Sequence, residues 1–456
     1  MEIVSDKNKK YRENPNPNAR IGFVVFYPFQ FNVFKNVYEH LKEEAEFIVD
    51  GGRFFPTPPP PEIIENCIRL LTQQGVYFRI LNYEDYRRQK YLADFFSNYK
   101  VLVGLWRSGC LVIPQTDKAR KVHMNYGAGK ELTMFWSRHR DWDLYLCLGP
   151  RVYEIIKLFT WAEIVGYPKF DDWFNDFVDE NAVAEIKKKL DPLKKTVLYL
   201  PTHGDLSSID ELAGELGKNA PYYNIVVKPH YYAPLEEPSR IKKLQCAGIL
   251  LFQDESDTQP FFKVADVVVS DNSSAIFDAI LADKPVVVTD FLSEEYLNES
   301  HKKLKSFRFR LPEGALTYSG SIEQRIKNDG SVVALKKAAE FKNAVERALA
   351  DGQEFQEARK KLREEIFAYS DGKCGERAAA AIKKLISLKR LPEKPILYHV
   401  FEAEYQTFRE YSNALNKTGP SGRGIMDYYS QQAIFRIKAL PLLRRILTVI
   451  RLFFGS

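Results

Sequence analysis

Short apolar runs alternate with helical patterns over most of the chain. Residues 21–26 form a continuous apolar run of the kind that is buried in a parallel sheet. A helical pattern follows through Phe34, Val37, Tyr38 and Leu41. Further along, the sequence predicts strands at residues 47–49, 77–81 and 100–105, a helix at 63–74, and a loop at 51–61, which contains five prolines.

The same alternation restarts after residue 195 with clearer strand patterns. Each of these strands is followed at once by polar residues, and the predicted strands are 196–200, 224–227, 248–252, 266–269 and 285–288. In open α/β sheets, ligands bind just past the carboxyl ends of the strands. The pattern therefore predicts an α/β fold with mainly parallel sheets, in which two units face a cleft and join near residues 165–190.

Composition and charge narrow the class of protein. The 456 residues are 45% hydrophobic and 28% charged, which is typical of a globular protein, and the length favours two domains. A net charge of +6 tolerates phosphates or acidic lipid but is too small for a nucleic-acid-binding protein.

The five scattered cysteines indicate neither a zinc site nor disulfides, so a reducing compartment is expected. The N-terminus shows no secretory signal and no run is long enough to span a membrane, which favours the cytoplasm.

Two strand ends carry candidate anion-binding groups. Ser270, Asp271, Asn272, Ser273 and Ser274 follow one strand and open an amphipathic helix, where hydroxyl groups and free backbone N–H groups make an anion site. An ordinary helix cap is the alternative for this segment.

A second strand ends in Lys228, Pro229 and His230, which present two cationic or hydrogen-bonding groups to the same edge of the sheet.

Two further segments are candidates on weaker grounds. His123 precedes Asn125, the glycines at 127 and 129, and Lys130; a neutral imidazole there suits a general base, and Lys130 suits an anion. The spacing is not that of a Walker loop. The second segment runs from Asp371 to Arg377 before an alanine-rich helix, and Arg377 there is either a clamp on the nucleotide or part of an ordinary helix start.

These segments together resemble the CDP-glycerol glycerophosphotransferases, which build wall teichoic acids and related capsule polymers. The matches follow the family's order over roughly residues 100–385. They are Trp142-Asp143-Leu144-Tyr145 with 166–171 ("WDY…GYPRND"), 197–205 ("ILYAPTWRD"), Lys228-Pro229-His230 ("RPH"), 270–274 ("SDYSS") with Phe277-Asp278 ("FDF"), and Asp371-Gly372 with Arg377 ("DG…R").

The resemblance implies a GT-B-like fold with two Rossmann-type domains facing a cleft. It implies that His123 matches the family's "HG" histidine, a base on the acceptor hydroxyl, and that His230 acts at the donor pyrophosphate. The expected donor-binding residues are Lys228, Thr202, His203, Asp271, Asn272, Ser273, Ser274 and Arg377, and the expected acceptor-binding residues are Asn125 and Lys130. This chain departs from the family at His203, at Asn272 and after His123, where "HGTPLK" is replaced.

The implied reaction moves glycerol phosphate, or a related polyol phosphate, from a CDP-activated donor to a hydroxyl of a lipid-linked or glycan acceptor. The acceptor oxygen attacks the β-phosphorus and CMP leaves, a step that depends on positioning and charge neutralisation. No cofactor is expected, and no carboxylate cluster demands a metal. Two alternatives remain: a GT-B enzyme that uses another nucleotide sugar (an epimerase-like enzyme included), and a non-catalytic membrane-associated scaffold.

The predicted organisation is a polar tail (1–20), an acceptor domain (21–170), a nucleotide-donor domain (171–390) and a helical tail (391–456). In the tail, a glycine-rich hinge at 419–424 precedes residues 442–454, where Arg444, Arg445 and Arg451 share one side of a helix and apolar residues cover the other. This pattern favours a helix that lies on an anionic membrane, at the inner face of the plasma membrane. A helix packed on the protein itself is the alternative.

Overall fold

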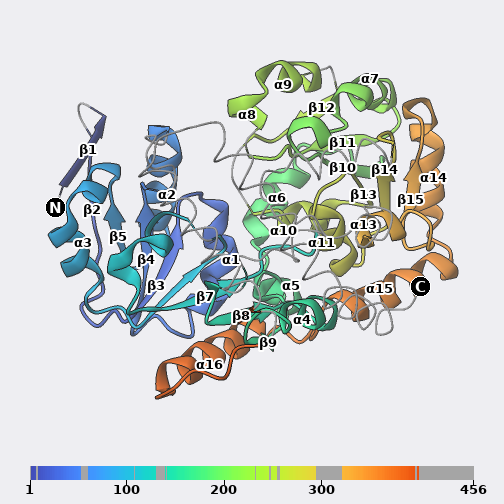
Figure 1. Ribbon diagram of the computed structural model, residues 1–456. Coiled ribbons are helices and arrows are strands. Elements are labelled where there is room, and N and C mark those ends of the chain that lie inside the picture. The colour runs from blue at the N-terminus through green and yellow to red at the C-terminus, as the bar shows by residue number, and fades with distance from the viewer. Residues whose placement is uncertain are drawn as a thin grey trace, which may run out of the picture.

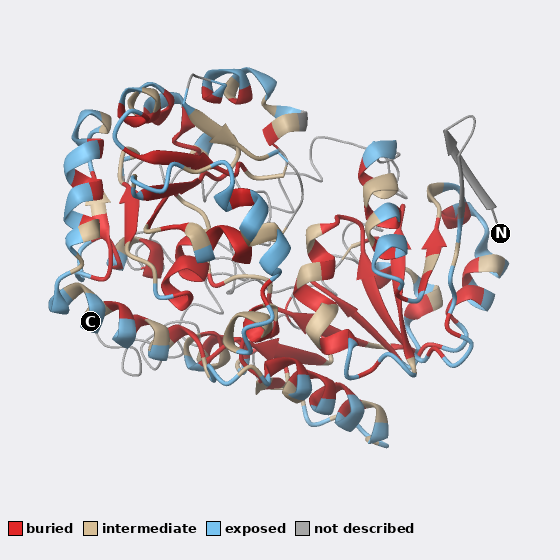
Figure 2. Cartoon of the chain, turned by 180° about the vertical axis from the view of Figure 1, so that it is seen from behind, coloured by how far each residue is buried: buried red, intermediate tan, exposed pale blue. Residues whose placement is uncertain are grey.

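The computed structural model describes residues 2–6, 9–52, 60–106, 108–129, 139, 141–231, 233–245, 248–253, 257–293, 321–395 and 398–399. Two parallel sheets lie side by side, each with helices around it (Figure 1). Their strands are the buried interior of each half, whereas the exposed residues lie mainly on the outer faces of the helices (Figure 2). The predicted α/β fold with two parallel sheets is therefore confirmed.

The first sheet has the strand order β5-β4-β3-β6-β7-β8-β9. Its strands are β3 (Ile21–Val25), β4 (Ala45–Asp50), β5 (Phe78–Leu81), β6 (Val101–Gly104), β7 (Arg120–Met124), β8 (Leu144–Cys147) and β9 (Ala162–Ile164). The helices of this half are α1 (Phe29–Tyr38), α2 (Pro61–Gln73), α3 (Gln89–Phe96) and α4 (Pro150–Ile156). A two-stranded antiparallel hairpin, β1 (Glu2–Asp6) and β2 (Lys9–Arg12), precedes them.

The second sheet has the order β12-β11-β10-β13-β14-β15. Its strands are β10 (Thr196–Leu200), β11 (Asn224–Val227), β12 (Ile249–Leu251), β13 (Val267–Ser270), β14 (Val286–Thr289) and β15 (Val333–Leu335). The helices from the join onward are α5 (Asp171–Phe174), α6 (Glu180–Lys187), α7 (Ile209–Asn219), α8 (Ala233–Glu236), α9 (Pro238–Leu244), α10 (Gln259–Val264), α11 (Ala275–Leu281), α13 (Ile322–Arg325), α14 (Phe341–Ala350), α15 (Gln353–Ile366) and α16 (Cys374–Ser387).

Helix α16 returns from the second half of the chain to the first sheet. Its alanine-rich face, with Ala378 and Ile382 fully buried, packs in the same core as Phe34 of α1 and the strands of the first sheet. In Figure 1 it runs beneath the first sheet. Asp171 holds the start of α16, because its carboxylate accepts hydrogen bonds from the backbone N–H groups of Cys374 and Gly375. Helix α16, which ends the predicted donor domain, thus stabilises the half that contains the first sheet.

The predicted extents of the domains stay predictions. The helical tail lies outside the described residues, apart from residues 391–395 and 398–399, and so do the hinge at 419–424 and the arginine-bearing segment at 442–454.

Candidate active site

The carboxyl edge of the second sheet is organised around a buried carboxylate. Asp271, directly after β13, accepts hydrogen bonds at Oδ1 from the N–H of Thr202 (2.8 Å) and at Oδ2 from the N–H (3.0 Å) and hydroxyl (3.1 Å) of Ser208. Burial raises the pKa of Asp271 to about 6, although these hydrogen bonds favour the charged form. Asp271 therefore fixes the loop after β10, and its predicted contact with the donor stays a prediction.

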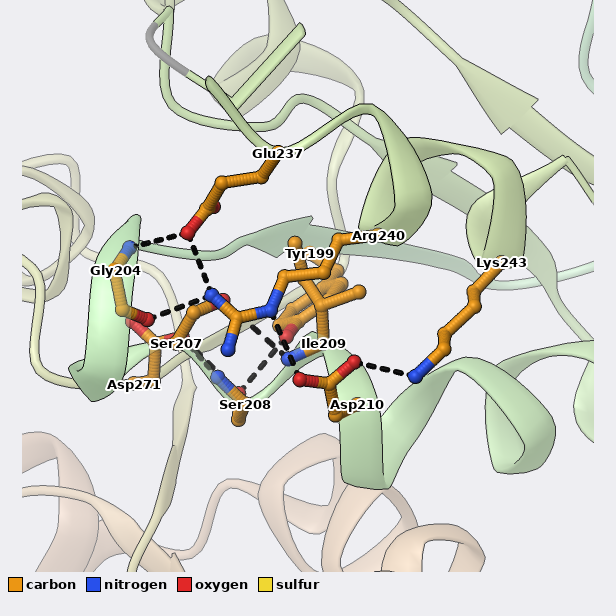
Figure 3. Close-up of polar contacts among 10 residues, drawn as sticks. All are labelled: Tyr199, Gly204, Ser207, Ser208, Ile209, Asp210, Glu237, Arg240, Lys243 and Asp271. Carbon is orange, nitrogen blue, oxygen red and sulfur yellow. Dashed lines mark hydrogen bonds and ion pairs between the residues drawn. The ribbon is translucent and has the colours of Figure 1, made fainter.

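Glu237, just before α9, and Arg240, within it, also hold this loop (Figure 3). Glu237 Oε1 accepts a hydrogen bond from the Gly204 N–H (2.8 Å), and Arg240 Nη1 donates to the Gly204 carbonyl (2.7 Å) and to Glu237 (2.6 Å). The guanidinium is fixed in turn, because its Nε donates to Asp210 (2.9 Å), which also pairs with Lys243 (2.6 Å). Sequence reasoning missed Glu237 and Arg240, since nothing local marks a helix as the support of a distant loop.

The loop held in this way carries His203, whose ring stacks on that of His230. The two ring centroids are 4.2 Å apart and the planes differ by 24°. His203 follows β10 and His230 follows β11, which are adjacent parallel strands, so the register brings the two imidazoles together. Lys228, which is buried, places its ammonium 5.2 Å from the centroid of the Phe261 ring. The structure thus gathers the predicted donor-side residues Thr202, His203, Lys228 and His230 at one edge.

At the predicted anion site before α11, the N-cap residue Ser274 makes no side-chain cap hydrogen bond, whereas its neighbours bond locally and to the β10 region. The Ser273 hydroxyl accepts a hydrogen bond from the Ala275 N–H (3.3 Å), and the Ser270 hydroxyl donates to the Leu200 carbonyl (2.6 Å). Asn272 donates to the Leu206 carbonyl (3.3 Å). A small pocket beside it is lined by Asn272 together with Leu206, Ser207, Ser208, Glu211, Thr289, Phe291, Leu292 and Lys327.

His123 is the last residue but one of β7 and lies among aromatic rings in the first half. Its ring stacks on Tyr145 (centroids 4.0 Å apart, planes 16° apart) and meets Trp142 edge-on (4.9 Å). Burial lowers the pKa of His123 well below its usual value, and the nearby His139 lowers it further; a hydrogen bond to the backbone of Leu105 acts in the opposite direction. The imidazole is therefore neutral at pH 7.

The neutral ring of His123 has a free acceptor position. Nδ1 is buried and has no hydrogen-bond partner among the residues that the structure describes. A buried polar atom without a partner is rare and marks either strain or a site for a missing group. The lone pair on this nitrogen is the one that an acceptor hydroxyl would need.

The loop after β7 touches the start of α11 across the two halves. A Cβ atom added to Gly127 would lie 2.9 Å from Cβ of Ser274, and one added to Gly129 would lie 2.9 Å from its Cα. Only glycine permits this approach, so the two glycines bring the predicted acceptor-side loop against the predicted donor-side motif. Asn125 is buried in that loop, and Lys130 lies outside the described residues.

Residues 115–384, well over half of the chain, match the family model described as "CDP-Glycerol:Poly(glycerophosphate) glycerophosphotransferase". The chain belongs to this family. It is a transferase of the CDP-glycerol glycerophosphotransferase type, so the predicted family and enzyme class are confirmed. No curated protein sequence matches the chain.

Solved structures share the fold of this glycerophosphotransferase. The wall teichoic acid polymerase TagF is 17% identical with a TM-score of 0.53, over 82% of this chain and 90% of that chain. TagF soaked with CDPG is 15% identical with a TM-score of 0.52, over 82% and 90% of the two chains. MnaA from S. aureus with UDP is 14% identical with a TM-score of 0.52, over 82% and 99%. These likenesses support the predicted GT-B-like fold.

Arg377 of the glycerophosphotransferase contacts residues just before α16. It sits in the first turn of α16, where its Nη1 donates to Asp371 (2.8 Å) and its Nη2 pairs with the same carboxylate. Its guanidinium also lies 3.9 Å from the centroid of the Tyr369 ring. This pairing holds the pKa of Asp371 down at about 2. The contacts found for Arg377 thus make it part of the start of α16, and its donor role stays a prediction.

A membrane-spanning helix and a metal site each place requirements on the described residues. None of the helices in the described part of the chain is both long and apolar enough to span a bilayer. Within the same residues, no group of three or more His, Cys, Asp or Glu side chains is placed to hold a metal ion.

Proposed function

We propose that this glycerophosphotransferase extends a teichoic acid type polymer by transferring glycerol phosphate from CDP-glycerol to a hydroxyl of a lipid-linked or glycan acceptor. The contact of Gly127 and Gly129 with Ser274 is the observation that carries the proposal. It joins the loop that follows His123 to the start of α11, so that a base and an anion-binding segment share one region. The likeness to TagF, a wall teichoic acid polymerase that has been soaked with CDPG, supports the same polymer and donor.

In this proposal, His123 is the general base. The acceptor oxygen attacks the β-phosphorus of CDP-glycerol, the bond from that phosphorus to the bridging oxygen breaks, and CMP leaves. The acceptor proton passes to Nδ1 of His123, whose lone pair has no other partner among the described residues. A low pKa weakens a base, but it keeps the imidazole unprotonated before the acceptor arrives.

The charge of the pyrophosphate is balanced from the second half. Lys228 and His230 lie at the end of β11, and the hydroxyls of Ser273 and Ser274 lie at the start of α11. Groups that are held in place before the reaction stabilise developing charge without the cost of reorientation. His203, fixed by the β10 loop and stacked on His230, restricts the orientation of that imidazole. Asp271 and Thr202 support the site through the loop, and Asn272 and Asn125 stay predicted contacts with donor and acceptor.

A panel of nucleotide donors tests the function. The full chain, given a lipid-linked acceptor, should release CMP from CDP-glycerol and add glycerol phosphate to the acceptor, whereas UDP- and CDP-sugars should give no turnover. The measurement is nucleotide release together with the mass of the acceptor product. Turnover of a nucleotide sugar without turnover of CDP-glycerol would contradict the proposal. The same assay with EDTA and with no added cofactor tests the further proposal that no metal or other cofactor is needed.

We also propose that the enzyme works in the cytoplasm, peripherally on the inner face of the plasma membrane, through the segment at 442–454. Its arginines share one helical side and no acidic residue follows position 434, which favours an anionic lipid surface. The lipid-linked acceptor that we propose would make such binding useful.

A chain truncated after residue 430 should move from the pellet to the supernatant when it is sedimented with phosphatidylglycerol vesicles. CMP release with a water-soluble acceptor analogue should persist, because none of the residues that we assign to the site comes after position 430. Unchanged sedimentation of the truncated chain would contradict the anchor, and vesicles of phosphatidylcholine alone are the control for charge.

A further inference from the structure

A column of neighbouring rings, some stacked and some tilted, links the two halves of the molecule beside the candidate site. The imidazoles of His203 and His230 form one end, with centroids 4.2 Å apart. Tyr231 lies on the other side of His230, also at 4.2 Å, with the planes 30° apart. All three rings belong to loops that follow strands of the second sheet. His230 is therefore held between two rings of its own half.

The opposite face of Tyr231 meets rings of the first half. Its centroid lies 4.8 Å from that of Phe29, with the planes 28° apart, and 5.0 Å from that of Tyr27. Phe29 and Tyr27 lie at the turn from β3 into α1. Tyr231 thus joins His230 of the second half to rings of the first half.

The first half presents these rings on a rigid support. The side-chain oxygen of Gln30, a fully buried residue, accepts hydrogen bonds from the N–H groups of Phe26 (2.7 Å) and Tyr27 (2.8 Å). Behind Phe29, Trp106 lies 6.1 Å away and Phe26 packs on Trp106 at 5.5 Å. A turn pinned by two hydrogen bonds and backed by packed rings holds a fixed surface towards Tyr231.

Stacked aromatic pairs prefer a narrow set of orientations and add stability beyond the area that they bury. Tyr231 makes such contacts in both directions, so its plane is restrained by the first half and restrains His230 in turn. An imidazole that has lost one stacking neighbour can rotate, and small misplacements of reacting groups lower rates steeply.

We propose that Tyr231 is a positioning residue of the transferase: its ring orients His230, and through it His203, only while the aromatic surface of the first half lies against it. The approach of the two halves then completes the donor side of the site. This inference rests on the proposed function, because it assigns Tyr231 to the transfer reaction.

The test compares three variants of the full chain. Tyr231→Ala removes the ring, Tyr231→Phe keeps the ring and removes only the hydroxyl, and Lys35→Ala is the matched control. Lys35 of α1 joins the two halves by another route, since its ammonium lies 2.6 Å from Asp172 and 3.4 Å from Asp257. Measured quantities are kcat and KM for CMP release from CDP-glycerol, the thermal midpoint, and backbone hydrogen exchange in α1.

We expect Tyr231→Ala to lower kcat by at least about tenfold, as misplacement of a charge-stabilising group should. Its KM for CDP-glycerol should change much less, and exchange at the start of α1 should rise. Tyr231→Phe and Lys35→Ala should stay within about twofold of the wild type, because both keep the ring column.

Three results would overturn the inference. They are wild-type kcat in Tyr231→Ala, an equal loss in Tyr231→Phe, which would assign the effect to the hydroxyl, and an equal loss in Lys35→Ala, which would assign it to closure in general. A wild-type chain without turnover of CDP-glycerol would instead contradict the proposed function. In that case, unchanged hydrogen exchange in Tyr231→Ala would still refute the link between the halves.

Discussion

Replacing His123 by glutamine should abolish most transfer, with kcat for CMP release lower by about 10²- to 10⁴-fold, the usual contribution of a general base. Glutamine has nearly the volume of histidine and leaves the buried site next to Tyr145 filled. It cannot take the acceptor proton at neutral pH. Binding of CDP-glycerol, measured by calorimetry, should be retained, because the donor groups come from the second half.

His139 provides a matched control for this prediction. It is buried in the same aromatic cluster, with its ring edge-on to Tyr145 at 5.2 Å and to His123 at 6.1 Å. His139→Gln should keep most activity. Because His139 lowers the pKa of His123, its removal should shift the acidic limb of the pH–rate profile towards higher pH. Transfer by His123→Gln within about fivefold of the wild type would rule out the base role.

Asp271→Asn should remove a pH dependence of stability and weaken the loop that carries His203. The pKa of Asp271 is raised to about 6 in the folded chain. The unfolded chain therefore loses this proton first as pH rises. The contribution of Asp271 to the free energy of unfolding is fully present below about pH 4 and is lost as pH rises to about 6. This loss is on the order of 3 kcal/mol. The free energy of unfolding of Asp271→Asn should not show this decrease.

The variant has a second defect that does not depend on pH. An amide group cannot accept all three hydrogen bonds that Asp271 receives from Thr202 and Ser208, and a buried donor left unsatisfied costs about 1–3 kcal/mol. CMP release should fall because the loop loosens. Urea unfolding of both chains between pH 4 and pH 8 measures the difference. Asp205→Asn, an exposed carboxylate on the same loop, is the control and should change stability by less than about 0.5 kcal/mol.

An identical pH dependence in the wild type and Asp271→Asn would show that this carboxyl does not titrate in that range. Equal stability of the two chains at every pH would show that the loop does not need the hydrogen bonds. The first result would contradict the raised pKa of Asp271, and the second would remove Asp271 as the support of the β10 loop.

The sequence by itself determined the class of fold and most of the strands of both sheets. Buried parallel strands are continuous apolar runs, and this local signal predicted β3, β6, β10, β11, β13 and β14 within a residue or two. The sequence also showed polar residues directly after the predicted strands. Because the strands are parallel, their carboxyl ends lie at one edge of the sheet. His203 and His230 accordingly meet, although they are 27 positions apart.

Only the tertiary structure decided what each polar group does there. Asp271 follows a strand end, but the partners of its carboxylate, Thr202 and Ser208, are more than 60 residues away in the sequence. Helix α16 crosses to the first sheet, and the glycines after β7 meet Ser274, both through contacts between distant segments. Hydrophobic periodicity is a local property that a sequence displays directly, whereas the partner of a hydrogen bond or a ring depends on how whole elements pack.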